Sequence, residues 1–175
     1  MHGCKPVDTP LPGGWRKEDT TSAEVVDAIV YRQLVGSLMY LVNTRPDICY
    51  AVNQLSQAMV KPTKLFWKAG KHVLRYLRGT SGYGLWYRQE DEVKLCGFMD
   101  ADRAGSSRGR VYGSKGIRYH HIRYCVQRRI MLLSYIPTED QDADILTKAL
   151  TRRKFEYHRD RIGVKDNPFL VEREC

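Results

Sequence analysis

Basic and aromatic side chains alternate along the second half of the chain, in a combination suited to an anionic polymer. No aspartate or glutamate occurs between Arg103 and Thr138, and Tyr112, Tyr119 and Tyr124 lie within this basic region. Aromatic rings stack on unpaired bases while cations contact phosphates, so the pattern is compatible with binding of single-stranded nucleic acid. The candidate anion-binding residues are Arg108, Arg110, Lys115, Arg118, Arg123, Arg128 and Arg129.

Histidine, serine and cysteine side chains offer no comparable site. His120 and His121 are adjacent, and neighbours on a helix point roughly 100° apart, so one metal ion cannot readily use both rings. Ser114 has no positioned base that would activate its hydroxyl. The five cysteines are widely spaced and contain no Cys-x-x-Cys pair. The sequence therefore predicts no metal, no cofactor and surface histidines.

Composition and charge restrict the classes of partner. The chain has 175 residues, 42% of them hydrophobic, and a formal net charge of +9, with a pI near 9.4. This length supports one ordinary core, and the excess of cations favours nucleic acid or phosphoinositide head groups as partners. No apolar run of signal-peptide type is visible, and no span of about 18 apolar residues is present. We expect no transmembrane segment.

The elements that must position these groups begin with three helices over residues 30–79, where apolar residues recur at steps of three and four. Gly36 and Ser37 are expected to allow a close neighbour, Pro46 to begin the second helix, Thr63 to cap the third and Gly79 to end it. The residues expected to face inward are Val30, Leu34, Leu38 and Leu41, then Ile48, Val52, Leu55 and Met59, then Leu65, Phe66, Ala69, Val73, Leu74 and Leu77.

The flanking segments read differently. Prolines and glycines predict an extended arm without regular structure before about Ser22. After the helices, the pattern predicts a hairpin that delivers Asp100 to a strand end, a helix, a buried strand, two further helices and a tail. The ranges of these elements are 85–87 with 94–99 for the hairpin, 117–127 for the helix, 130–136 for the strand, 140–150 and 152–162 for the later helices, and 164–175 for the tail.

Several short segments together resemble the C-terminal part of a Ty1/copia retrotransposon polyprotein. They are residues 4–7 (CKPV), 31–38 (YRQLVGSL), 44–48 (TRPDI), 72–80 (HVLRYLRGT) and 143–148 (ADILTK). In that family the end of reverse transcriptase is followed by a helical connection and a ribonuclease H domain. The resemblance implies an α+β fold, with a helical N-terminal connection module followed by an incomplete RNase H-like α/β remnant. The implied domains are a Pro/Gly-rich arm (1–29), the three-helix connection (30–79), the truncated RNase H-like region (80–163) and the tail (164–175).

The resemblance also bears on catalysis. Ribonuclease H chemistry uses about four carboxylates around two magnesium ions, which hold the attacking water and the leaving oxygen. The family's first aspartate matches Asp100 in residues 100–105 (DADRAG), and its last matches Asp144. The family's glutamate and its other aspartate have no counterpart, because no acidic residue lies between Arg103 and Thr138. We therefore expect Asp100 and Asp144 to be relict acids and the protein to lack enzymatic activity, unless a partner chain supplies the missing acids.

A second resemblance concerns the tetrad Arg75, Tyr76, Leu77 and Arg78, which precedes the acidic residues 90–92. Chains with such features resemble the RxLR effectors of oomycete plant pathogens. This implies secretion, entry into the host cytoplasm or nucleus, and suppression of host cell death through an unknown host protein. Our first hypothesis is such an effector. The alternatives are a non-catalytic nucleic-acid-binding remnant of the retroelement, or a transposon fragment without a selected role. In both alternatives the tetrad is an ordinary part of the third helix.

Overall fold

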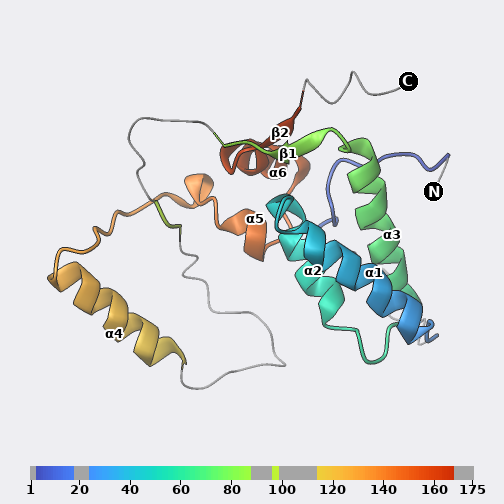
Figure 1. Ribbon diagram of the computed structural model, residues 1–175, viewed down its shortest axis with the longest axis horizontal. Coiled ribbons are helices and arrows are strands. Elements are labelled where there is room, and N and C mark those ends of the chain that lie inside the picture. The colour runs from blue at the N-terminus through green and yellow to red at the C-terminus, as the bar shows by residue number, and fades with distance from the viewer. Residues whose placement is uncertain (1–2, 18–23, 88–95, 99–113, 168–175) are drawn as a thin grey trace. The chain divides into compact units, whose positions relative to one another are not determined.

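The computed structural model describes residues 3–17, 24–87, 96–98 and 114–167, and for residues 114–120 it describes the backbone only. The chain divides into two compact units (Figure 1). Unit 1 comprises residues 1–98 together with 142–175, and unit 2 comprises residues 99–141. Unit 1 is thus discontinuous in sequence, because unit 2 is inserted between its two parts.

Three helices form most of unit 1, as the periodicity predicts. They are α1 (Ala28–Leu41), α2 (Cys49–Ser56) and α3 (Lys64–Gly79), which pack against one another (Figure 1). Asp27 caps α1, since its Oδ1 accepts a hydrogen bond from the Ile29 amide at 2.7 Å. Pro46 begins the short 3-10 helix η2 (Pro46–Ile48) that leads into α2. Thr63 occupies the N-cap of α3 without a side-chain hydrogen bond.

The buried stripe of α1 differs from the predicted one. Tyr31, Val35 and Leu38 are buried, whereas Val30 is 44% exposed. The predicted Leu34 and Leu41 are only half-buried. The helix is rotated toward Tyr31 because that hydroxyl donates a hydrogen bond to the Leu55 carbonyl at 2.7 Å, which places a large ring in the core without an unsatisfied polar atom.

The close approach of a neighbour that was expected at Gly36 occurs at Gly70 instead. A side-chain carbon added at Gly36 would meet no atom within 4 Å, so Gly36 faces open space. One added at Gly70 of α3 would lie 3.0 Å from the Leu34 Cδ2 atom. The small residue that admits α1 is therefore on α3.

Helices α2 and α3 follow their predicted stripes more closely. Ile48, Val52 and Leu55 are buried, with Met59 packed beside them. On α3, Ala69 and Val73 are buried. The remaining predicted residues of α3, which are Leu65, Phe66, Leu74 and Leu77, are half-buried against the same core.

The N-terminal arm contributes to the core rather than lying outside it. Leu11 and Trp15 are only 4% and 5% exposed, and the Trp15 ring meets the edge of Phe66 at 5.3 Å. Residues Trp15–Lys17 form the 3-10 helix η1, so the expectation of no regular structure before Ser22 was wrong. Prolines remove backbone amide donors but leave apolar side chains able to pack.

The second part of unit 1 completes this core. It contains α5 (Asp144–Thr147), α6 (Arg152–Arg161) and the strand β2 (Val164–Asp166). Ile145 and Phe155 are buried in the same cluster as the N-terminal helices. The predicted helix at 152–162 is confirmed, whereas the one predicted at 140–150 is reduced to a short 3-10 helix, η3 (Thr138–Asp140) in unit 2, and the single turn α5.

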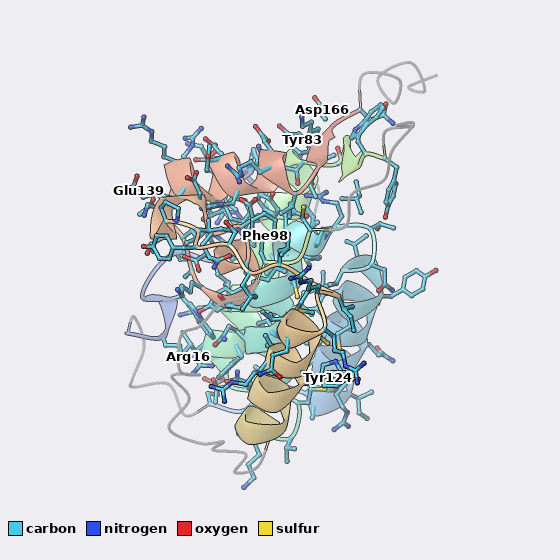
Figure 2. The ribbon with its side chains drawn as sticks, turned by 90° about the vertical axis from the view of Figure 1, so that its left-hand side faces the viewer. Arg16, Tyr83, Phe98, Tyr124, Glu139 and Asp166 are labelled. Carbon is cyan, nitrogen blue, oxygen red and sulfur yellow. The ribbon has the colours of Figure 1, made fainter. Side chains whose placement is uncertain are left out.

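The first strand of the predicted hairpin forms two residues earlier and pairs with another strand, while the turn and residues 94, 95 and 99 of the expected second strand lie outside the described residues. Strand β1 (Tyr83–Leu85) pairs antiparallel with β2, with Tyr83 opposite Asp166 (both labelled in Figure 2). Residues 96–98, the described part of the expected second strand, do not form a strand. The segment predicted to be a tail therefore begins with a strand. Helices with a small two-stranded sheet place the described fold in the α+β class.

Unit 2 contains helix α4 (Ser114–Gln127), as predicted, but no strand at residues 130–136. Ile130, Leu132 and Tyr135 are 68%, 92% and 89% exposed, so the expectation of a buried strand there was wrong. A strand requires a neighbour for its amides. In the described part of the chain, the sheet consists of β1 and β2, so residues 130–136 have no strand to pair with.

Candidate functional site

The described part of the basic region ends in an exposed cluster of cations on α4 and just beyond it. Arg123, Arg128 and Arg129 are exposed. Lys115 and Arg118 lie on the helical backbone of α4. Arg108 and Arg110 lie outside the described residues.

Of the three tyrosines expected to interleave with these cations, Tyr124 is the one whose side chain is described, because Tyr112 lies outside the described residues and Tyr119 has only its backbone described. Tyr124 (labelled in Figure 2) is 50% exposed, and the Arg128 guanidinium carbon lies 5.3 Å from the centre of its ring. A guanidinium over an aromatic face is held electrostatically while its outer donors stay available to an anion. The Arg128–Tyr124 pair thus presents a positive charge and a stacking face together. We name the exposed residues Arg123, Tyr124, Arg128 and Arg129 the α4 basic cluster.

The α4 basic cluster is positioned by a helix end that lacks the usual glycine. The Ile130 amide donates to the Cys125 carbonyl at 2.9 Å and the Arg129 amide to the Val126 carbonyl at 3.0 Å. This pair of bonds is the Schellman motif. Arg129 occupies its left-handed position with φ 56°, where glycine is favoured. Arg129 therefore occupies a backbone conformation that disfavours any residue with a side-chain carbon.

Replacement of Arg129 by glycine should stabilise the protein. A non-glycine residue in the left-handed region costs about 1–2 kcal/mol, and loss of a cation at the helix C-terminus removes about 0.3–1 kcal/mol, so we expect a net gain of about 1 kcal/mol. Urea unfolding followed by circular dichroism measures it. Arg123→Gly, inside α4, is the control and should destabilise by about 1 kcal/mol. Destabilisation by Arg129→Gly would contradict the motif.

The tetrad at residues 75–78 has a structural role in unit 1. Arg75 Nε donates to the Lys5 carbonyl and Arg78 Nη1 to the Cys4 carbonyl, each at 2.7 Å. Both arginines thus hold the N-terminal arm along α3. Leu77 is half-buried, and Tyr76 is fully buried, a core residue that the stripe prediction missed.

Two further residues of α3, Gly79 and His72, also contact the N-terminal arm. A side-chain carbon at Gly79 would lie 2.8 Å from the Pro6 Cβ atom, so the arm packs directly on the end of α3. A ring nitrogen of His72 lies 3.1 Å from the Thr9 carbonyl oxygen. The surface of α3 that carries the tetrad is therefore covered in part by the chain's own arm.

Below the tetrad lies a buried ion pair that sequence reasoning overlooked. Arg45 meets Asp47 with two hydrogen bonds, Nε to Oδ1 at 3.0 Å and Nη2 to Oδ2 at 2.8 Å. Tyr76 donates its hydroxyl to Asp47 Oδ2 at 2.6 Å. Thr80 accepts from Arg45 through its carbonyl and its hydroxyl, both at 2.8 Å. The side chains of Arg45 and Asp47 are 6% and 0% exposed, so the network stabilises the fold from inside.

Burial and charge shift the pKa values of this network. Burial alone would lower the pKa of Arg45, but the hydrogen bond and charge of Asp47 raise it. Burial raises the pKa of Tyr76, and the negative charge of Asp47 raises it further. Burial likewise raises the pKa of Tyr31. At neutral pH Arg45 therefore stays a cation, and the phenol of Tyr76 keeps the proton that it donates to Asp47.

Stability should fall in alkali because of these two tyrosines. Their pKa in the folded state is raised above the ordinary value of 10.0. Above pH 10 the unfolded chain loses phenolic protons that the folded chain retains, so the free energy of unfolding decreases. We expect a loss of about 1 kcal/mol per tyrosine between pH 8 and pH 11, measured by urea unfolding. Tyr31→Phe should flatten the dependence, whereas Tyr40→Phe, at an 82% exposed position, should not.

The structure describes only one of the two acids expected to be catalytic relicts. Asp100 lies outside the described residues. Asp144 is 7% exposed on α5 and accepts from Lys148 Nζ at 3.1 Å. Among the described residues, no three histidine, cysteine, aspartate or glutamate side chains are grouped to hold a metal ion. No helix of that same part is long and apolar enough to cross a membrane.

Comparison with known proteins bears on this arrangement. The chain is 42% identical over 123 residues to the retrovirus-related Pol polyprotein from transposon RE2 of Arabidopsis thaliana, which is 69% of this chain and 8% of that protein. The polyprotein from transposon RE1 of the same plant is 41% identical over 123 residues, and these relatives are retrovirus-related Pol polyproteins of copia-type transposons. The polyprotein from transposon TNT 1-94 of Nicotiana tabacum is 28% identical over 255 residues, covering 95% of this chain and 19% of that protein. No protein-family model and no solved structure matches the chain.

Two features of these alignments qualify the relationship. The chain spans only 8% of the RE2 polyprotein, so most of that protein has no counterpart here. The tobacco alignment extends over 255 positions, more than the 175 residues of this chain, so that relative has additional residues within the shared region. The Secreted RxLR effector protein 161 of Plasmopara viticola is also similar, with 46% identity over 83 residues, 47% of this chain and 58% of that protein.

Proposed function

We propose that this transposon-derived chain binds single-stranded nucleic acid and does not cleave it. The observation that carries the proposal is the α4 basic cluster, in which Arg128 lies over the exposed ring of Tyr124. Phosphates are contacted by guanidinium groups and bases by aromatic faces, and the cluster offers both. The net charge of +9 adds long-range attraction for a polyanion.

The acids that remain in the sequence support the absence of cleavage. Asp100 and Asp144 are two carboxylates for a reaction that uses about four around two metal ions. Asp144 is buried and paired with Lys148, which supports a structural role. The additional residues of the tobacco relative are consistent with the loss of a segment from this chain.

Fluorescence anisotropy with a labelled oligouridine or oligothymidine tests the binding. We expect the logarithm of the affinity to fall linearly with the logarithm of salt concentration, with a slope of about −0.7 for each phosphate contacted. The double variant Arg123→Glu/Arg128→Glu should reduce both the affinity and the steepness of the slope. Arg153→Glu/Lys154→Glu, an equal charge change on exposed positions of α6, is the control and should have a smaller effect. No binding at low salt, or a slope near zero, would overturn the proposal.

A second candidate function is an effector that suppresses host cell death. It is favoured by the similarity to the Plasmopara viticola effector and by the tetrad at residues 75–78. It ranks lower because Arg75 and Arg78 are engaged with the arm, and because the RE1, RE2 and TNT 1-94 relatives are transposon polyproteins. Secretion, host-cell entry and a host protein target belong to this candidate alone.

Co-expression with a cell-death elicitor in leaf cells tests the second candidate. Reduced death that disappears with Arg75→Ala/Arg78→Ala and is retained by Arg75→Lys/Arg78→Lys would support it. Hydrogen exchange of residues 4–9 in the purified variants reports whether the arm has detached. Undiminished cell death with the unmodified chain would count against an effector.

A further inference from the structure

A second aromatic and basic surface lies in unit 1, away from the basic region in the sequence. It is a hollow of about 830 Å³ beside the β1–β2 sheet. Trp86, Tyr87, Tyr157, Arg161 and Lys165 line it, together with Asp160 and Gly163. We name it the sheet-edge pocket. The α4 basic cluster contributes none of these residues.

The backbone that builds the sheet-edge pocket is well defined. The Trp86 amide donates to the Gly163 carbonyl at 2.9 Å, which continues the pairing of β1 with β2 by one residue. Gly163 has φ 85°, a left-handed turn that carries the chain from α6 into β2. A side-chain carbon there would lie 3.4 Å from the Trp86 carbonyl oxygen. Trp86 is therefore fixed at a strand end rather than on a free loop.

Helix α6 supplies Tyr157, Asp160 and Arg161 to the lining of the pocket. Tyr157 and Arg161 are four residues apart and share one face of the helix. Arg161 Nη1 donates to the Tyr157 hydroxyl at 2.8 Å, and its guanidinium carbon lies 5.3 Å from the Tyr157 ring centre. Arg161 Nε is also bonded to Asp142 at 2.9 Å. These contacts restrain the Tyr157 ring before any ligand arrives.

The aromatic rings of the sheet-edge pocket are exposed. Trp86, Tyr87 and Tyr157 are 40%, 83% and 46% exposed, although they gather in one place. Exposed aromatic side chains that converge on a hollow indicate a binding surface more than a packing defect. Arg161 is paired with Asp142, so the exposed Lys165 is the lining cation that remains to contact a phosphate.

We propose that the sheet-edge pocket binds bases of single-stranded nucleic acid. The bases stack on Trp86 and Tyr157, and Lys165 contacts the adjoining phosphate. Stacking of this kind tolerates any base, because every base has a π face. The inference rests on the proposed function and assigns it a second contact site. An apolar peptide would fit this site less well, because Arg161 and Lys165 line it.

Intrinsic fluorescence and anisotropy together test the pocket. A twelve-residue oligothymidine and an abasic strand of the same length serve as probes. We expect the base-containing strand to quench Trp86 emission and to bind about tenfold or more tightly than the abasic strand, since stacking is lost with the bases. Trp86→Ala should weaken oligothymidine binding by about 5- to 100-fold. Trp86→Phe keeps a ring and should retain most of the affinity.

Tyr40→Ala is the matched control, because Tyr40 is an 82% exposed aromatic residue on α1 outside the pocket. Circular dichroism checks that each variant is folded. If the unmodified protein binds neither strand, the proposed function fails and the pocket fails with it. If it binds, but Trp86→Ala leaves the affinity unchanged while Arg123→Glu/Arg128→Glu weakens it, only the pocket is overturned. Equal affinity for both strands, or quenching by an apolar peptide alone, would also overturn the pocket.

Discussion

Replacement of Asp47 by alanine is expected to lower the free energy of unfolding by about 3–5 kcal/mol, a large part of the stability of an ordinary domain. The substitution leaves the guanidinium of Arg45 buried without its counter-charge and the hydroxyl of Tyr76 without its acceptor. An unpaired buried charge costs more than the pair contributes, since the remaining guanidinium has lost its hydration without a counter-charge in return. Urea unfolding at pH 7 measures the change.

The control for Asp47 is an ion pair on the surface. Asp8 and Arg152 are in contact at 2.9 Å with side chains 58% and 64% exposed. Asp8→Ala should cost less than about 1 kcal/mol, because water and salt screen an exposed pair. Similar losses for Asp47→Ala and Asp8→Ala would contradict the buried network.

Replacement of Phe155 by alanine is expected to be about as damaging, with a loss of about 3–5 kcal/mol. Phe155 is 5% exposed and meets the Tyr76 ring edge-on at 5.6 Å. It therefore joins α6 to α3, two elements that are far apart in the sequence. The large cavity left by an alanine should loosen residues 142–167 from the helical core.

Urea unfolding and native-state hydrogen exchange measure the effect of Phe155→Ala. Exchange should accelerate in α6 and β2 before it does in α2. Tyr157→Ala, on the same helix at a 46% exposed position, should cost about 1 kcal/mol or less. A small effect of Phe155→Ala would show that the second part of unit 1 does not share the core.

The helices of unit 1 were predictable because their information is local. Apolar residues at steps of three and four located α2 and α3 and most of their buried faces. The face of α1 was misplaced because Tyr31 is amphipathic, and its burial depends on a carbonyl of α2 that no local pattern reveals. Proline-rich residues 3–17 gave no periodic signal, although Leu11 and Trp15 enter the core.

The pairing of β1 with β2 was not predictable from pattern alone. Each strand has three residues, and the whole of unit 2 separates them. A hairpin with the next β-like segment was the simpler hypothesis, because sequential strands usually pair. The apolar residues 130–136 were expected to be a strand for the same local reason, but local propensity does not supply a partner.

The candidate sites also differ in how far the local sequence reveals them. The α4 basic cluster could be found from charge and aromatic spacing, since a helix end keeps sequence neighbours together in space. The role of Arg75 and Arg78 depends on carbonyls of Lys5 and Cys4, which lie far away in the sequence. The Arg45–Asp47 pair did carry a signal, two opposite charges flanking a helix-starting proline, but the need to bury them becomes evident only in the fold.

The central claim, that the molecule holds nucleic acid without cutting it, is tested most directly with a fluorescent RNA:DNA hybrid that carries a single-stranded RNA extension, in the presence of magnesium. We expect anisotropy to rise on addition of the protein while the RNA strand stays full length on a denaturing gel. RNA shortened by the purified protein, or anisotropy unchanged at low salt, would contradict it.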